Sequence, residues 1–78
     1  MNPRRLPVVT EREVIRASRK GGFVVVRQKG SHVRLVHSED KSRKTTVPDH
    51  GSRLLKDRTL DAILDEAVIS PEDFMALL

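Results

Sequence analysis

The sequence of 78 residues has no cysteine, no tryptophan and no tyrosine, and its only phenylalanines are Phe23 and Phe74. Without cysteine there is no disulfide framework, no thiolate zinc site and no thiol redox chemistry. With so few aromatic rings, the chain has little on which single-stranded bases can stack. Valine, leucine and isoleucine must supply the core, and they suffice for one sheet covered by two helices.

Long apolar runs are also missing. No stretch is long enough to span a bilayer, and no apolar segment of signal-peptide length follows the two arginines of residues 1–7. We therefore expect a cytoplasmic protein that does not contact a membrane. We also expect a single domain over residues 1–78 with a thin core, because so short a domain buries only roughly 60% of the surface of its unfolded chain.

Charge is distributed unevenly along the chain. Residues 1–44 contain twelve Lys or Arg against four acids, a net charge of +8, whereas residues 45–78 contain three bases against seven acids, a net charge of −4. A basic half in a small domain favours a polyanionic partner, and the commonest polyanion in a cell is a nucleic-acid backbone. A solvated surface without a partner is the alternative that charge alone leaves open.

The first helix is predicted from about residue 11 to residue 20. Thr10 and Glu13 have the spacing of a capping box, and Gly21-Gly22 supplies a left-handed stop. The periodicity gives this helix a narrow buried stripe of Val14, Ile15 and Ser18, and a basic outer face of Arg12, Arg16 and Arg19.

Three strands are predicted next, over residues 23–29, 31–37 and 43–47. The first is rich in β-branched side chains, and Gly30 allows a tight turn into the second. By alternation, Val33 and Leu35 face the core while His32 points away from it. Pro48 is expected to end the third strand, because it has no amide hydrogen to donate.

Two helices are predicted after an irregular stretch from Asp49 to Arg58. Thr59 is the expected cap of the first, and Ser70 with Pro71 starts the second. The buried face of the first helix is expected to comprise Leu60, Ile63, Leu64 and Ala67, with Asp61, Asp65 and Glu66 in water. The inward side chains of the second helix are expected to be Phe74, Leu77 and Leu78. The fold class is therefore α+β, a three-stranded antiparallel sheet with helices on one face, in the α-β-β-β-α order of a double-stranded-RNA-binding domain.

Histidines change charge near neutral pH, and cleavage of RNA by its own 2′-hydroxyl needs such a group to move a proton. His32 is the best placed of the three, because it follows the Gly30 turn on the outer face. The neighbouring cations that can hold a phosphate and offset charge growing on it are Arg27, Lys29 and Arg34. An exposed strand histidine without a role is the other interpretation, and the pattern alone favours it.

The other two histidines, His37 and His50, are interpreted as surface or hydrogen-bonding residues, since one borders a polar turn and the other lies in a loop. Neither the pair His32 and His37 nor the adjacent Asp49 and His50 has a recognised metal-ligand spacing. The acids gather on the C-terminal helices, away from the basic hairpin, which argues against a two-metal nuclease. We predict metal-independent chemistry and no small-molecule cofactor.

The run Gly22-Phe23 followed by Arg27-Gln28-Lys29-Gly30-Ser31-His32 resembles the HicA (YcfA-like) family of messenger-RNA interferase toxins. A second block resembles the family in order and spacing: Thr46-Val47-Pro48, His50-Gly51, Leu55-Lys56, and Thr59-Leu60 with Ile63-Leu64. The similarity covers about residues 10–78. Asp57-Arg58 departs from it, because the family usually has a glycine directly before the Thr-Leu pair, so we expect the loop into this helix to be shaped differently.

The resemblance implies a double-stranded-RNA-binding-domain-like fold, an endoribonuclease acting on messenger RNA, and neutralisation by a HicB-like antitoxin. It also implies a catalytic histidine that maps to His32. We place the RNA-binding residues in the same hairpin: Arg27, Lys29, Gly30, Ser31 and Arg34. The second proton of the reaction stays open between water, a lysine and His50. For the basic residues outside the motif, RNA binding and a purely solubilising role both stay open: Arg4, Arg5, Lys41, Arg43 and Lys44.

Two other hypotheses explain the same basic surface. A non-catalytic RNA-binding module predicts binding that weakens with salt and does not depend on His32. A protein-interaction domain predicts that the basic face docks on an acidic partner such as the antitoxin, and this is compatible with an enzyme whose inhibitor covers its active site.

Overall fold

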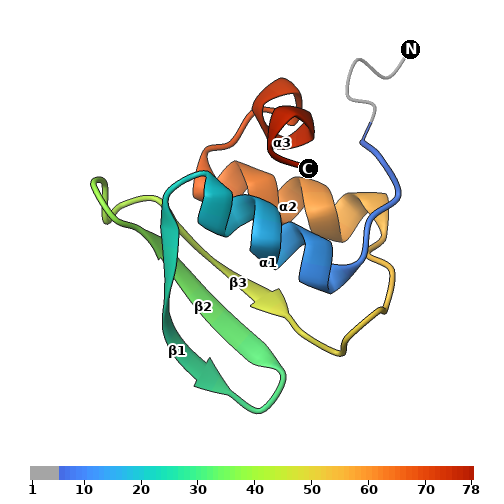
Figure 1. Ribbon diagram of the computed structural model, residues 1–78, viewed down its shortest axis with the longest axis horizontal. Helices are drawn as coiled ribbons and strands as arrows, with labels where there is room; N and C mark the ends of the chain where they lie inside the picture. The colour runs from blue at the N-terminus through green and yellow to red at the C-terminus, as the bar shows by residue number, and fades with distance from the viewer. Residues whose placement is uncertain (1–5) are drawn as a thin grey trace.

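The computed structural model describes residues 6–78, in which a three-stranded antiparallel sheet carries its helices on one face (Figure 1). The strands lie in the order β1-β2-β3. Along the chain the elements are α1 (Glu11–Lys20), β1 (Phe23–Lys29), β2 (His32–His37), β3 (Lys44–Pro48), α2 (Asp57–Ala67) and α3 (Pro71–Leu77). The predicted α+β fold class is confirmed, and the arrangement agrees with that of a double-stranded-RNA-binding domain followed by one further short helix.

The predicted capping box starts α1. The Thr10 hydroxyl accepts a 3.1 Å hydrogen bond from the Glu13 amide, and the Glu13 carboxylate accepts a 2.8 Å bond from the Thr10 amide. The left-handed residue after the helix is Gly22, with φ +100°, whereas Gly21 has φ −81°. Of the predicted stripe, Val14 is fully buried but Ile15 only half-buried.

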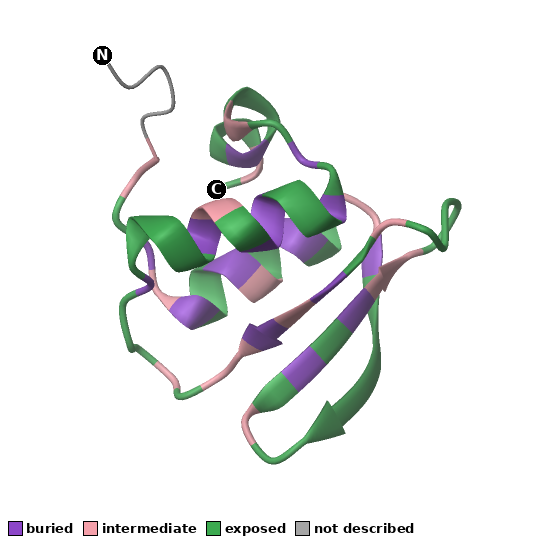
Figure 2. Ribbon diagram, turned by 180° about the vertical axis from the view of Figure 1, so that it is seen from behind, coloured by how far each residue is buried: buried purple, intermediate pink, exposed green. Residues whose placement is uncertain are grey.

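The sheet alternates between a buried and an open face (Figure 2). Val33 and Leu35 of β2 and Val47 of β3 are buried under α1 and α2, whereas His32, which begins β2 on the opposite face, is exposed, as predicted. In β1 only Phe23 is buried. The register of β1 against β2 shifts between Val25 and Arg27, a bulge in the strand that the helices leave largely uncovered.

Three strand boundaries, the start of β2 and both ends of β3, differ from the prediction by one residue. Ser31 belongs to the turn, so β2 begins at His32, and β3 shifts to Lys44–Pro48. Pro48 is tolerated inside β3 because this is an edge strand, where a missing amide donor costs no bond of the ladder. The next amide, that of Asp49, donates to the Ser31 carbonyl at 2.6 Å.

The predicted cap of α2 at Thr59 is wrong, because the helix begins at Asp57, three residues before the start that a cap at Thr59 implies. Lys56 is the N-cap in extended conformation without a side-chain bond, and its carbonyl accepts from the Leu60 amide at 2.9 Å. Asp57 places an acid at the positive end of the helix dipole. Asp57 and Arg58 form the first turn of the helix, which a glycine at this position would weaken.

The buried face of α2 agrees with the prediction: Leu60, Ile63, Leu64 and Ala67 are all buried. Of the three acids expected in water, Asp65 and Glu66 are exposed while Asp61 is half-buried. The Glu66 carboxylate also accepts a 2.9 Å bond from the Thr45 hydroxyl, which joins α2 to β3.

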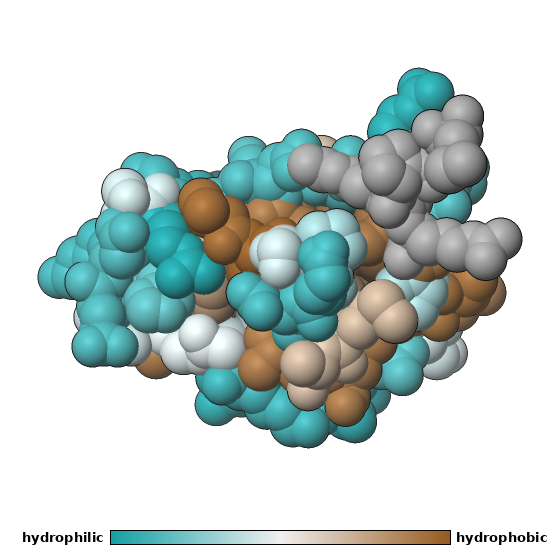
Figure 3. All heavy atoms as spheres, turned by 90° about the horizontal axis from the view of Figure 1, so that it is seen from above, coloured by the Kyte–Doolittle hydropathy of each residue, from teal (hydrophilic) through white to brown (hydrophobic). Residues whose placement is uncertain are grey.

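Ser70 caps α3 as predicted, and its hydroxyl accepts from the Asp73 amide at 3.1 Å. Phe74 is fully buried and Leu77 packs against the core. Leu78 is 48% exposed, so its predicted inward orientation is wrong, because the helix ends at Leu77. On the side of the molecule where α3 lies, apolar side chains gather near the middle of the surface, with hydrophilic side chains around them (Figure 3).

The irregular stretch before α2 pairs with the start of α1, a contact that was not predicted. Residues 9–11 and 53–55 run antiparallel, with a bridge between Thr10 and Leu54. The Leu55 amide donates to the Val9 carbonyl at 3.0 Å, and the Glu11 amide donates to the Arg53 carbonyl at 2.9 Å. This pairing, here called the strap, sets the start of α1 beside the loop after β3. Among residues 6–78, no helix has both the length and the apolarity to cross a membrane.

Candidate functional site

The open face of the sheet collects the predicted site residues into two cross-strand rows. His32 of β2 pairs with Lys29 of β1 and with Pro48 of β3. One row further along, Arg34 pairs with Arg27 and with Thr46. Directly paired residues share a face of the sheet and lie about 5 Å apart. The imidazole therefore lies among three cations on a surface that the helices do not cover.

The turn before His32 is formed by Gly30 and Ser31, both predicted as site residues. Gly30 has φ +59°, a conformation that glycine adopts without strain. A Cβ at Gly30 would meet no atom within 4 Å, so the backbone there is open to an approaching ligand. The Ser31 carbonyl is occupied by the Asp49 amide, which joins the turn to the loop after β3.

The cations of this face lack acidic partners within residues 6–78. The ion pairs in that region join Arg12 to Asp49 and His50 to Glu11, and neither includes Arg27, Lys29 or Arg34. All three cations are exposed. Like charges opposite each other on a sheet destabilise it. The face is therefore electrostatically complementary to an anion that spans Arg27, Arg34 and His32.

His37 has a structural role, as predicted for a hydrogen-bonding residue. Its Nδ1 atom accepts bonds from the Glu39 and Asp40 amides at 3.1 and 3.2 Å, which closes the turn after β2. Its ring packs edge-on against Phe23 with 5.1 Å between ring centres. Both contacts hold His37 in the fold, away from the row of His32.

Arg43 also has a structural role, in addition to the RNA-binding and solubilising roles that the sequence left open. Its guanidinium donates to the Ala67 carbonyl at 2.9 Å and to the Val68 carbonyl at 3.1 Å, where α2 ends. It also lies 5.5 Å from the ring centre of Phe23. Of the other basic residues outside the motif, Lys44 is exposed on the open face opposite Val36, whereas Arg4 and Arg5 lie outside the described residues.

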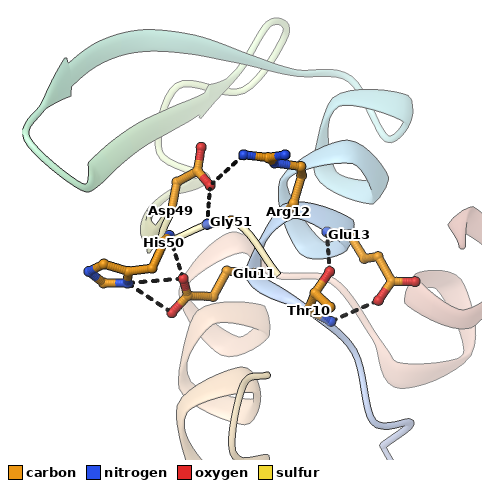
Figure 4. A network of polar contacts seen from close by, with 7 residues as sticks. All are labelled: Thr10, Glu11, Arg12, Glu13, Asp49, His50 and Gly51. Carbon is orange, nitrogen blue, oxygen red and sulfur yellow. Dashed lines mark hydrogen bonds and ion pairs between the residues drawn. The ribbon is translucent and has the colours of Figure 1, made fainter. Parts of the chain in front are cut away.

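His50 is anchored by a residue that sequence reasoning missed. Glu11 is 2% exposed, and its carboxylate accepts from the His50 amide at 2.7 Å and contacts the His50 Nδ1 atom at 3.0 Å (Figure 4). The side chain of His50 itself is 39% exposed. No signal in the sequence points to this pair, because an acid in the first turn of a helix is ordinarily a solvated residue and its partner lies 39 positions away.

A network next to this pair connects α1 to the turn of His32. Arg12 lies 3.9 Å from the Asp49 carboxylate, which also accepts a 3.2 Å bond from the Gly51 amide (Figure 4). Because the Asp49 amide also donates to the Ser31 carbonyl, Asp49 links the start of α1 to the end of the hairpin. Within residues 6–78, no three histidine or acidic side chains form a group that could hold a metal ion.

A comparison with protein-family models decides the family. The model described as HicA toxin of bacterial toxin-antitoxin matches residues 12–69, which is most of the chain. The chain belongs to the HicA toxin family. A search of curated proteins found no match.

Membership of the HicA family makes this chain the toxin of a toxin-antitoxin system, and therefore a protein with an antitoxin partner. The matched region contains β1, β2, β3 and the loop of His50, so the two cross-strand rows belong to the family domain. Glu11 lies one residue before the matched region.

Proposed function

We propose that this HicA toxin is a metal-independent endoribonuclease in which His32 is the catalytic residue and messenger RNA the substrate. The observation that carries the proposal is the row of Lys29 and His32 beside the facing pair of Arg27 and Arg34, which lack acidic partners. An exposed imidazole among such cations suits a phosphodiester, because they hold the anion and the ring moves a proton.

The proposed reaction is a transphosphorylation. The His32 imidazole takes the proton of a ribose 2′-hydroxyl, and the 2′-oxygen attacks the adjacent phosphorus. The bond from phosphorus to the 5′-oxygen breaks, and this oxygen leaves with a proton from water or from a neighbouring acid. Arg27 and Arg34 offset the additional charge on the phosphoryl oxygens as it develops. The products are a 2′,3′-cyclic phosphate and a 5′-hydroxyl end.

Each predicted site residue has a role in this proposal. Lys29 lies opposite His32 and holds the phosphate on the side of β1. Gly30 and Ser31 present exposed backbone at the turn, where RNA passes the end of the hairpin. For the proton of the 5′-oxygen, Lys29 and the Glu11-anchored His50 are both candidates. We further propose that the antitoxin is HicB-like and neutralises the toxin by covering this face.

The test is cleavage of a labelled messenger RNA by the purified protein in excess chelator, compared with a His32→Ala variant. Cleavage by the parent alone, with cyclic phosphate and 5′-hydroxyl ends, supports the proposal. A Thr46→Ala variant is the matched control, because Thr46 shares the face and pairs with Arg34 without carrying charge. Equal cleavage by parent and His32→Ala would remove His32 from the mechanism.

The alternative is a non-catalytic RNA-binding module of the same fold. The unpaired cations favour it, because they can bind RNA without any contribution from His32. In that case the parent leaves the RNA intact in the same assay, while the parent and the His32→Ala variant bind the RNA with equal affinity. Thermal unfolding of each variant accompanies the assay, so that loss of activity is separated from loss of fold.

A further inference from the structure

The outer face of α1 carries a row of four cations that the proposed active site does not use. Arg12, Arg16, Arg19 and Lys20 are all exposed, and they line an open groove with the half-buried Ile15. Their spacing of three and four residues stacks them along one side of the helix. Successive turns place them about 6 Å apart along the axis. This row is called the α1 row below.

The acids of α1 leave most of this charge uncompensated. The Glu11 carboxylate is buried against His50, and the Glu13 carboxylate is held by the Thr10 amide, with Arg16 only a minor influence on it. Arg12 has a single ion pair, at 3.9 Å from Asp49 and with the Arg12 side chain 66% exposed. Like charges one turn apart destabilise a helix. The α1 row is thus a concentrated cationic stripe within the described chain.

The α1 row begins at the end of the sheet that carries His32. Arg12 contacts Asp49, and the Asp49 amide donates to the carbonyl of Ser31, the residue before His32. From Arg12 the row runs along α1, away from that end. A polymer held at His32 on the open face can therefore reach the row on α1 by passing round this end of the sheet at Asp49.

We propose that the α1 row is a second binding site for the phosphate backbone of the RNA whose scissile phosphate lies at His32. This inference rests on the proposed function and adds a substrate property, namely that the toxin favours an RNA long enough to reach from His32 to α1. Contacts of this kind position the RNA without reading its bases, because they go to phosphate oxygens.

The composition of the α1 row favours RNA over an acidic protein partner. Protein interfaces are centred on buried aromatic or large apolar anchors. The exposed large apolar side chains of the described chain lie elsewhere: Val8, Val24, Val25, Val26, Leu54, Val68, Met75 and Leu78. A phosphate backbone needs no apolar anchor, since release of its counterions supplies the affinity.

The test uses a double variant, Arg16→Gln with Arg19→Gln, which removes two charges and keeps good helix formers. Binding is measured by fluorescence anisotropy over a series of salt concentrations, with a 30-nucleotide RNA and in a His32→Ala background that prevents cleavage. We expect weaker binding at low salt. We also expect the slope of log affinity against log salt to become shallower by about 1.4, because each lost contact to a single strand removes about 0.7.

A second measurement uses the His32-intact protein with two substrates. The double variant is expected to raise the KM for the 30-nucleotide RNA and to leave cleavage of a four-nucleotide RNA unchanged, because the short RNA does not reach α1. Lys56→Gln with Arg58→Gln is the matched control, since it removes the same charge from exposed positions at the start of α2. That pair is expected to change the salt slope much less.

Three outcomes overturn the inference. One is an unchanged salt slope in the double variant, and another is an equal loss with both RNA lengths. The third is unchanged RNA binding with loss of antitoxin binding, which would assign the α1 row to the protein partner. If the parent cleaves no RNA at all, the proposed function fails, while the anisotropy measurement still decides whether the row binds RNA.

Discussion

Arg27 and Arg34 lie directly opposite each other on β1 and β2, with both side chains on the open face of the sheet. No acid within residues 6–78 pairs with either of them. Cross-strand like charges lower the stability of a sheet, so this pair opposes folding, although it suits the proposed binding of an anion.

Replacing Arg27 by Thr is therefore expected to raise stability and lower RNA affinity together. The gain is about 0.5 kcal/mol, from relief of the facing charges and from the strand preference of a β-branched side chain. Urea unfolding measures the stability, and anisotropy with labelled RNA measures the affinity.

Lys44→Thr is the control for this prediction, because Lys44 is on the same face but lies opposite the apolar Val36. It removes one cation without relieving a facing like charge. If both variants change stability by the same amount, the facing arginines contribute no repulsion and the argument is wrong.

Removing the Glu11 carboxylate is expected to destabilise the protein. Glu11→Ala leaves the His50 amide without its acceptor in a partly buried position, at a cost of roughly 1–3 kcal/mol. Glu11→Gln keeps an acceptor of the same size and is expected to lose less. Both values come from urea unfolding at neutral pH.

Glu13→Ala is the matched control for Glu11, since it removes an acid from the same helical turn at an exposed position. Its effect is expected to be smaller because the freed Thr10 amide is reached by water. An effect of Glu13→Ala as large as that of Glu11→Ala would mean that burial of Glu11 adds nothing.

Two exposed carboxyl groups predict how stability depends on pH. The Thr10 amide, and next its hydroxyl, hold the pKa of Glu13 below the ordinary 4.5. The Ser42 hydroxyl, and next its amide, hold the pKa of Asp40 below the ordinary 3.8. A lowered folded-state pKa contributes stability above the unfolded-state value, and this contribution is lost as the pH falls through the folded-state pKa. Stability is therefore expected to decrease on acidification below about pH 4.5.

Removing the hydroxyls is expected to affect these two groups differently. Ser42→Ala deletes the largest influence on Asp40, so the pKa of that carboxyl is expected to rise toward its ordinary value. Thr10→Ala leaves the amide that is the larger influence on Glu13, so its pKa recovers only in part. Carboxyl chemical shifts followed by NMR against pH measure both. A full return for Glu13 would contradict the primary role of the Thr10 amide.

The periodic parts of the fold were predictable from the sequence. Capping residues and apolar spacing located α1 and the buried face of α2, and alternation along β2 placed His32 and Leu35 on opposite faces. The cap of α2 was misplaced because a threonine is a better cap in isolation than the Lys56 that takes the position. Here the helix begins earlier, with the charged residues Asp57 and Arg58 in its first turn. Capping preference alone does not predict this earlier start.

Contacts between distant segments were not predictable. The pairing of Glu11 with His50 and the C-terminal cap that Arg43 supplies to α2 both join positions far apart in sequence. Neither has a local pattern, because each depends on how the helices settle on the sheet. The candidate site was located from its motif, since all its residues lie within one hairpin, whereas its link to α1 through Asp49 was visible only in three dimensions.

The strap between residues 9–11 and 53–55 has a consequence for the order of folding. The hairpins of the sheet close over short loops. The strap must bring together segments that are more than forty residues apart in sequence, so closing its loop costs more conformational entropy. We expect the hairpins to form early and the strap to close late. The bond from Asp49 to Ser31 then completes the turn of His32 only when the loop beside the strap is in place. A nascent or partly folded chain would accordingly hold the sheet before it holds the finished turn, so the proposed site at His32 is complete only at the last stage of folding.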